Sequence, residues 1–283
     1  MYASTVRGLL VRGMLAGLIA GLFAFAVAYV VGEPPVRGSI AVEEAAAAQE
    51  AGAAGASGAA SGHAGHAGHG GDAASGAAEE EEELVSRPVQ STVGLATGVL
   101  VYGVALGGIA SLAFSFALGR IGGFSPRATA ALTGAGAFAL VYLVPFLKYP
   151  ATPPAVGNPD TIGQRTTLFF LMILLSVLLG IGAIILGRRL APRLGNWNAT
   201  LAAAGGFIAA TTLAFVFLPD NSDAVQPGFP AALLWEFRLA SLAVQLVLWA
   251  AFAIVFGVLA QRLLDARTDG AEVTAQQQAP ALG

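Results

Sequence analysis

The sequence predicts an all-α integral membrane protein, a six-helix transmembrane bundle with a long disordered loop on its outer side. The 283 residues are 56% hydrophobic and only 11% charged, whereas a typical soluble domain carries about 25% charged residues. Six apolar stretches reach the length of about 20 residues that crosses a bilayer as a helix. None contains an acidic residue or a Lys, and Arg12 is their single Arg. The stretches are residues 8–31, 92–118, 129–147, 166–186, 199–218 and 239–260.

The first stretch is predicted to be a retained helix. Its residues Gly13, Gly17 and Gly21 are spaced by four, a pattern of small residues that lets two membrane helices pack closely. A cleaved signal peptide is the alternative, because residues 26–28 read Ala-Val-Ala and would leave five spans. The apolar run over 14–31 exceeds the length of about 7–15 residues usual for a signal peptide, which favours the retained helix.

Basic residues predict the orientation. With the N-terminus inside, nine Arg residues lie near inner span ends and five basic residues near outer ones, and both inner loops, 119–128 and 187–198, are rich in Arg. Fourteen acidic residues then lie outside and three inside. The positive-inside rule therefore places both termini in the cytoplasm. Arg is used almost throughout in place of Lys, and Ala and Gly are abundant, which indicates a GC-rich bacterium and hence its inner cell membrane.

The outer segment between the first two spans is polar and of low complexity. Residues 45–78 are nearly all Ala, Gly, Ser and His, and they bury too little apolar surface to offset the entropy of ordering. A short helix over 39–53 is the exception we allow, because Ala and Glu favour helix. The predicted organisation is a first helix over 1–31, a disordered outer loop over 32–91, the other five helices over 92–263, and a disordered cytoplasmic tail over 264–283.

The only three histidines of the chain, His63, His66 and His69, form a repeat of period three within the outer loop. Neutral imidazole is a favoured ligand of Co, Ni, Cu and Zn ions. In polyproline II, with three residues per turn, all three rings lie on one side of the chain. The pattern indicates an exposed, exchangeable capture site. The alternative is unselected copying of Gly-His-Ala in a low-complexity linker.

Carboxylates gather at the predicted outer ends of the helices. Glu33, Asp160 and Glu236, with Asp220 and Asp223, lie where they could ring a vestibule and guide a cation inward. For Glu236 the alternative is an ordinary interfacial position beside an aromatic anchor. The metal-binding candidates are therefore His63, His66, His69, Glu33, Asp160 and Glu236.

Several kinds of chemistry have no basis in the sequence. Cysteine is absent, which excludes disulfides, thiolate metal sites and thiol catalysis. No phosphate-binding loop, nucleophile-elbow or zinc-protease motif occurs. Deep within the spans the polar groups are Gln245 and a few hydroxyls. We expect no enzyme, no bound cofactor and no nucleic-acid partner.

Five segments carry a resemblance to a known family. They are residues 84–92 (LVSRPVQST), 142–150 (YLVPFLKYP), 153–162 (PPAVGNPDTI), 233–238 (LLWEFR) and 32–34 (GEP). With them the chain resembles the CbtA-type probable cobalt transporter subunit family over about residues 5–263, apart from the Ala/Gly/His linker. The resemblance implies a multi-helix component of cobalt uptake, linked to cobalamin supply and paired with a small single-span subunit that carries histidines. Members of the family are often drawn with five spans.

Three functions fit these observations. The first is a subunit that takes up cobalt or nickel from the outer face, with the histidines capturing the ion and the carboxylates guiding it. The second is a non-transporting membrane scaffold or accessory subunit. The third is a channel for another small solute or ion.

Overall fold

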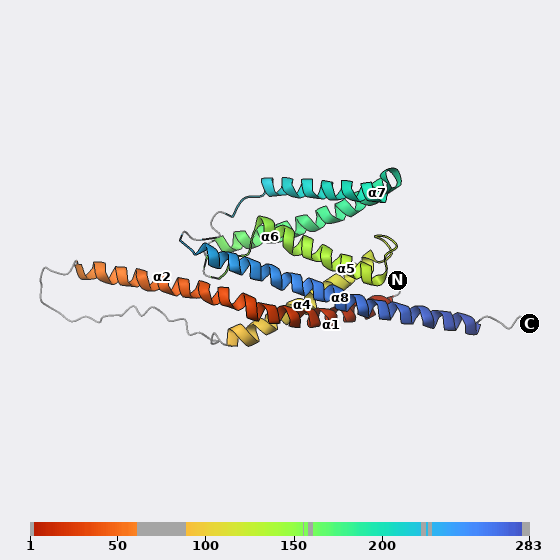
Figure 1. The fold of residues 1–283 in the computed structure, drawn as a ribbon, viewed down its shortest axis with the longest axis horizontal. Helices are drawn as coiled ribbons and strands as arrows, with labels where there is room; N and C mark the ends of the chain where they lie inside the picture. The colour runs from red at the N-terminus through yellow and green to blue at the C-terminus, as the bar shows by residue number, and fades with distance from the viewer. Residues whose placement is uncertain are drawn as a thin grey trace, which may run out of the picture.

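The described residues form helices and turns without a strand (Figure 1). The computed structural model describes residues 3–60, 89–154, 156–157, 161–221, 225 and 228–278. In chain order the elements are α1 (Ala3–Val27), the π-helical turn η1 (Ala28–Gly32), α2 (Glu33–Ala60), the π-helical turn η2 (Gln90–Gly94), α4 (Leu95–Ala117), α5 (Pro126–Ala137), the π-helical turn η3 (Phe138–Leu143), α6 (Val144–Lys148), α7 (Ile162–Phe217) and α8 (Ala231–Gln278).

Five helical stretches among the described residues are long and apolar enough to cross a membrane. The chain is therefore an all-helical, multi-pass membrane protein, as the sequence predicts. The five stretches are Ala3–Ala53, Gln90–Ala117, Pro126–Lys148, Ile162–Phe217 and Ala231–Gly270.

The fourth stretch, α7, turns back on itself at Gly195. Gly195 has φ 74° and ψ 161°, which lie outside the helical region and suit a residue without a Cβ. Near this bend the two arms touch, because a Cβ on Gly187 would lie 3.3 Å from the Cβ of Ala203. The arms run in opposite directions (Figure 1). They cover the two stretches 166–186 and 199–218 that the sequence predicts as separate spans.

The first helix continues well beyond its apolar stretch. α1, η1 and α2 form one continuous helical element to Ala60, which corrects the expectation of a disordered loop from residue 32 onward. A helix that is already nucleated extends readily through Ala- and Glu-rich sequence. Pro34 and Pro35 are accommodated directly after the wider π turn, in which the Glu33 N–H donates to Ala28 O. Residues 61–88, with the three histidines, lie outside the described residues.

Helix α8 likewise extends to Gln278, so the expected disorder of 264–283 is wrong for its first part. Arg267 explains the extension, because it ties α8 to the start of α1. Its Nη1 donates to Thr5 Oγ1 at 2.6 Å, and its Nη2 donates to Ser4 O at 3.0 Å. Gln261 also donates to Asp265 one turn later, at 2.7 Å.

Glycines bring α1 and α4 into backbone contact. A Cβ on Gly17 would lie 2.1 Å from Gly103 O, and one on Gly13 would lie 2.3 Å from the Cβ of Ser111. A Cβ on Gly107 would lie 2.4 Å from Gly13 O. These distances leave no room for any side chain, so the predicted close-packing role of the glycine stripe is confirmed.

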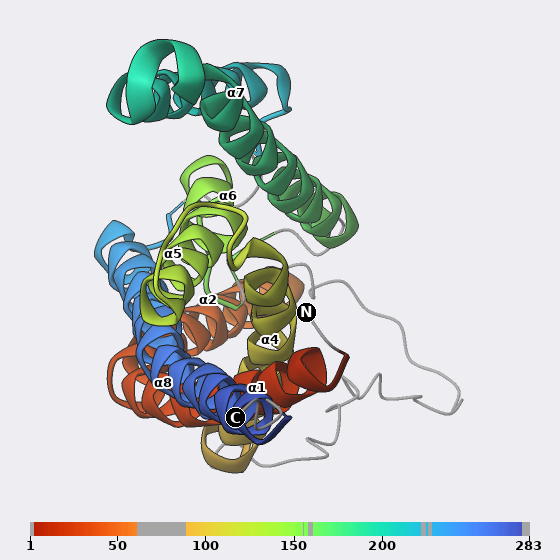
Figure 2. The ribbon, with the colours of Figure 1, turned by 90° about the vertical axis from the view of Figure 1, so that its right-hand side faces the viewer.

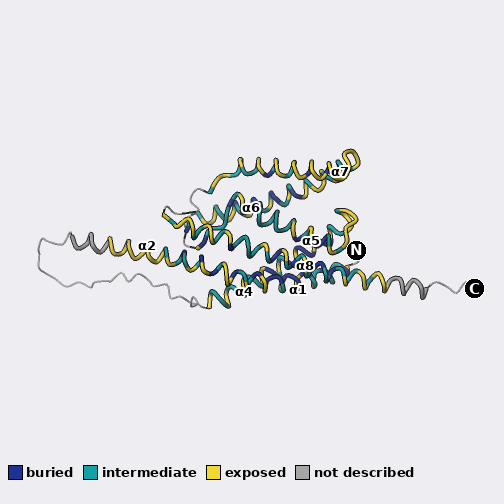
Figure 3. Tube along the Cα trace, viewed as in Figure 1, coloured by how far each residue is buried: buried dark blue, intermediate teal, exposed yellow. Residues whose placement is uncertain are grey.

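The best-buried part of the bundle is aromatic. Phe114 on α4 meets Phe256 on α8 edge to face, with ring centroids 5.0 Å apart, and Phe252 stacks on Phe256 at 5.2 Å. Trp249 packs on Phe252 at 6.1 Å. Burial falls off toward the outside of the bundle (Figure 3), where many large apolar side chains are exposed. That is the pattern expected of a surface that faces lipid.

The topology determines which segments lie at each end of the bundle. The start of α1, the end of α8, the 118–125 connection and the bend of α7 lie toward one end of the molecule, and the end of α6, the two ends of α7 and the start of α8 lie toward the other (Figure 1). Figure 2 shows α7 at the edge of the bundle, away from the packed group of α1, α4 and α8. We call the first the arginine-rich end, since the inner Arg residues predicted above gather there, and the second the proline end.

Candidate metal site at the proline end

Two of the six predicted metal-binding residues lie in the described part of the chain. His63, His66, His69 and Asp160 fall outside it. Glu33 and Glu236 are described, on α2 and α8. Among the described residues no group of three or more His, Cys, Asp or Glu side chains is placed to hold a metal ion.

Glu33 is a buried carboxylate at the junction of η1 and α2, with only 5% of its surface exposed. Its Oε1 accepts a long hydrogen bond of 3.4 Å from Nε of Arg37, whose side chain is 62% exposed. An ion pair with an exposed partner is screened by water and contributes little. Arg37 alone therefore contributes little to holding the Glu33 carboxylate, which also makes a further interaction besides this pair.

The packing of α2 on α8 determines the level of Glu33 along the bundle axis. A Cβ on Gly38 would lie 2.8 Å from Leu233, and a Cβ on Gly8 would lie 3.2 Å from Leu263. Gly8 and Gly38 are separated by the same number of residues as Leu233 and Leu263. The element α1–α2 and helix α8 therefore run antiparallel in one constant register. In this register Glu33 lies level with Arg238.

Glu236 is exposed on the first turns of α8. Its neighbour Trp235 is also exposed, at 60%. This environment is typical of an aromatic and polar belt at the membrane surface.

A second group of charged and polar residues lies at the proline end, where α6, α7 and α8 meet. Lys148 pairs with Asp220, and the Tyr149 hydroxyl donates to Pro219 O at 2.9 Å. Nε of Arg238 donates to Ala151 O at 3.3 Å. Burial raises the pKa of Tyr149, so this phenol stays protonated and able to donate.

These residues surround a cavity of about 270 Å³. Its lining includes two cations, Lys148 and Arg238, and one carboxylate, Asp220. From the sequence, Asp220 is predicted to lie in a cation-guiding vestibule. In the structure its carboxylate is instead paired with Lys148, whose side chain is only 9% exposed. The cavity itself disfavours a divalent cation, and sequence reasoning missed this role of Lys148 and Arg238.

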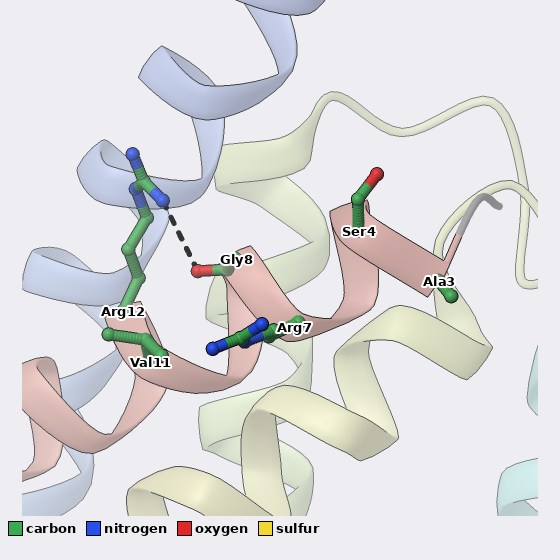
Figure 4. Close-up of a pocket in the computed structure, with 6 residues that line it drawn as sticks. All are labelled: Ala3, Ser4, Arg7, Gly8, Val11 and Arg12. Atoms are coloured by element: carbon green, nitrogen blue, oxygen red, sulfur yellow. Dashed lines mark hydrogen bonds between the residues drawn. The ribbon is translucent and has the colours of Figure 1, made fainter.

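The arginine-rich end has a groove of about 580 Å³ beside the start of α1 (Figure 4). It is lined by Ala3, Ser4, Arg7, Gly8, Val11 and Arg12. Nη1 of Arg12 donates to Gly8 O at 3.2 Å, one turn earlier on the same helix. Its arginines are those that the positive-inside rule places next to the membrane, and they offer no ligand to a metal cation.

Polar side chains also meet within the apolar part of the bundle. The Tyr102 hydroxyl on α4 lies beside Gln245 on α8. The Tyr142 hydroxyl on η3 lies beside Ser241 on α8 and near Tyr102. The sequence identifies Gln245 as a candidate functional residue, because it is an amide inside a predicted span. It does not single out the two tyrosines, because tyrosine is common at the ends of spans.

Together these features define a class: a multi-pass helical membrane protein with a buried carboxylate at one boundary and an arginine-rich opposite end. The sequence model of the family described as "Probable cobalt transporter subunit (CbtA)" matches residues 6–261. The chain belongs to the CbtA family. No curated protein and no solved structure matches the chain.

Proposed function

We propose that this chain is the membrane subunit of an uptake transporter for cobalt or nickel. The family match over residues 6–261 is the observation that carries the proposal. The ion is cargo, and the chain acts without catalysis or a resident cofactor. The molecule lies in the inner membrane of a bacterium with its arginine-rich end in the cytoplasm.

We propose six spans, with each arm of α7 crossing the membrane once. The Gly195 bend supports this count, because it reverses the chain between two apolar arms. The first span is retained, since α1 packs on both α4 and α8 and its glycines contact the backbone of α4. A cleaved first segment would remove one side of that contact.

In this proposal the outer residues act in sequence. His63, His66 and His69 capture the ion, and Asp160 and Glu236 raise its concentration near the surface. Glu33 then receives it at the membrane boundary. The burial of Glu33 supports this role, because a carboxylate that is poorly hydrated gains more from a cation than an exposed one.

Cobalt uptake further requires a partner subunit. The family description contains the word "subunit", and we propose a small single-span protein that carries histidines. Lipid is the other partner of the bundle, through the exposed apolar side chains of its outer faces.

A second candidate function is a non-transporting scaffold. The cavity at the proline end favours it, because a lining with two cations and one carboxylate suits a carboxylate of another protein better than a divalent metal ion.

Radioactive cobalt accumulation separates the two functions. Cells lacking other cobalt importers would express this chain alone, the single-span partner alone, or both, each at equal membrane levels. The transport function predicts cobalt or nickel accumulation that requires this chain and is greatest with both subunits. Accumulation by the partner alone, undiminished without this chain, would establish the scaffold function instead.

A further inference from the structure

Four polar side chains from three elements converge in the apolar part of the molecule, at the edge of the bundle, where Tyr102 is 43% exposed. Tyr102 comes from α4, Tyr142 from η3, and Ser241 and Gln245 from successive turns of α8. Residues four apart on a helix lie on one face, so Ser241 and Gln245 present their polar groups to the same interface. Tyr142 lies in a π turn, the kind of helix irregularity that is frequent at functional sites.

Protein groups satisfy the polar atoms of this cluster only in part, although Tyr102 lies within reach of Gln245 and Tyr142 within reach of Ser241. Tyr142 Oη and Gln245 Oε1 are buried without a hydrogen-bond partner among the described residues. Trp249 lies one turn further along the same face of α8 and is only 5% exposed. Its Nε1 is likewise buried without a hydrogen-bond partner among the described residues. Buried polar groups are normally paired, and water is the common partner where protein groups are lacking.

The cluster is closed on the side of the arginine-rich end. Trp249 packs on Phe252, and Phe252, Phe256 and Phe114 form the aromatic core described above. All three phenylalanines are at most 2% exposed. An apolar constriction of this kind excludes water and ions until it opens.

The opposite side of the cluster leads toward Glu33. In the antiparallel register of α2 and α8, Glu33 is level with Arg238, three residues before Ser241. At a helical rise of about 1.5 Å per residue, Ser241 lies about 5 Å deeper than Glu33 along the axis.

We propose that Tyr102, Tyr142, Ser241 and Gln245 line a water-filled crevice that receives a hydrated divalent cation from Glu33 and ends at the aromatic core. The cargo rests on the function proposed above, whereas the crevice does not. Hydroxyl and amide oxygens are neutral ligands that bind a hydrated cation weakly enough to release it. The negative charge needed to attract the ion is supplied by Glu33 at the entrance.

Cysteine accessibility tests the crevice, since the chain contains no cysteine of its own. A thiol reacts with a charged methanethiosulfonate as the thiolate, which requires water. We would measure modification rates of Ser241→Cys and Gln245→Cys in membrane fragments that expose both faces. Leu246→Cys is the matched control, because Leu246 follows Gln245 but is 55% exposed on the bundle surface. Asp220→Cys, at a side chain 89% exposed, sets the rate in open water.

Both crevice cysteines should react at least about tenfold faster than Leu246→Cys, while Phe256→Cys should match the slow control. Smaller acceleration of both crevice cysteines would overturn the inference. Ser241→Cys exchanges a hydroxyl for a thiol of similar size, so it keeps the test valid if Gln245→Cys fails to reach the membrane.

Cobalt uptake by Gln245→Leu distinguishes the crevice from the function on which its cargo rests. Reactive crevice cysteines together with cobalt accumulation that falls about tenfold in Gln245→Leu would support the whole inference. Reactive cysteines in a chain that moves no cobalt with any partner would retain the crevice and contradict the function and its cargo. Cobalt accumulation with unreactive cysteines would retain the function and reject the crevice.

Discussion

Ser176 on α7 shares its hydroxyl hydrogen between the carbonyl oxygen of Leu140 on η3 and that of Ile173 in its own helix. Within η3 the Val144 N–H bonds to Ala139 O, five residues earlier. The next residue, Pro145, has no N–H to continue this pattern, so Leu140 O loses its helical donor. Ser176 replaces that donor from another helix, and a Cβ on Gly180, one turn along α7, would lie 2.6 Å from the Leu140 side chain. The π turn thereby anchors the bent α7 to the bundle.

Removal of the Ser176 hydroxyl should destabilise the protein. Ser176→Ala leaves Leu140 O without a donor in the apolar interior, and hydrogen bonds between membrane helices contribute about 0.6–2 kcal/mol. We expect a lower melting temperature in detergent, measured by fluorescence-detected size exclusion after heating. Thr167→Ala is the matched control, because the exposed Thr167 hydroxyl bonds only to Gly163 O of its own helix. Equal melting temperatures for the two variants would contradict the anchoring role.

The contact of α1 with α4 should not tolerate a methyl group. Gly17→Ala places a Cβ about 2.1 Å from Gly103 O, and overpacking of this kind costs about 1–3 kcal/mol. Gly98→Ala on α4 is the control, since nothing lies within 4 Å of its Cβ. The same heating assay should show a loss for the first variant and no loss for the second. A neutral Gly17→Ala would mean that the two helices pack less closely in the membrane.

The buried and the exposed carboxylate should differ in their effect on transport. Glu33→Gln keeps the size of the side chain but removes the charge at the membrane boundary, and we expect cobalt accumulation to fall about tenfold. Glu236→Gln removes an exposed charge that water screens, and we expect a fall of about twofold at most. Both are measured as initial rates of radioactive cobalt uptake at equal membrane levels. A larger loss of uptake for Glu236→Gln than for Glu33→Gln would indicate that Glu236, and not Glu33, is the carboxylate that receives the ion.

The histidine tract should matter most when cobalt is scarce. Replacing His63, His66 and His69 by Ala removes a capture site, which lowers the local concentration of the ion but not the capacity of the bundle. We expect reduced uptake at low external cobalt and unchanged uptake at saturation. An unchanged concentration dependence would remove the capture role and favour an unselected linker.

The apolar stretches and the glycine contact could be predicted from the sequence for a physical reason. Lipid requires long uncharged helices, and close helix packing requires small residues at regular spacing. The 187–198 turn was also predictable from its arginines, and the structure adds the conformation of Gly195 within it.

Other features depend on contacts that no local pattern reveals. The continuation of helix through Pro34 and Pro35 depends on the π turn that precedes them. The extension of α8 depends on Arg267 reaching Thr5, at the other end of the chain. The burial of Glu33 and the pairing of Lys148 with Asp220 likewise result from tertiary packing.

Cysteine labelling from outside intact cells tests most directly whether the chain crosses the membrane six times with its arginine-rich end in the cytoplasm. In the cysteine-free chain, Asn196→Cys reports the bend of α7 and His69→Cys the histidine tract. An impermeant maleimide should label His69→Cys in intact cells and Asn196→Cys only after permeabilisation. Labelling of Asn196→Cys in intact cells, with His69→Cys protected, would contradict the account.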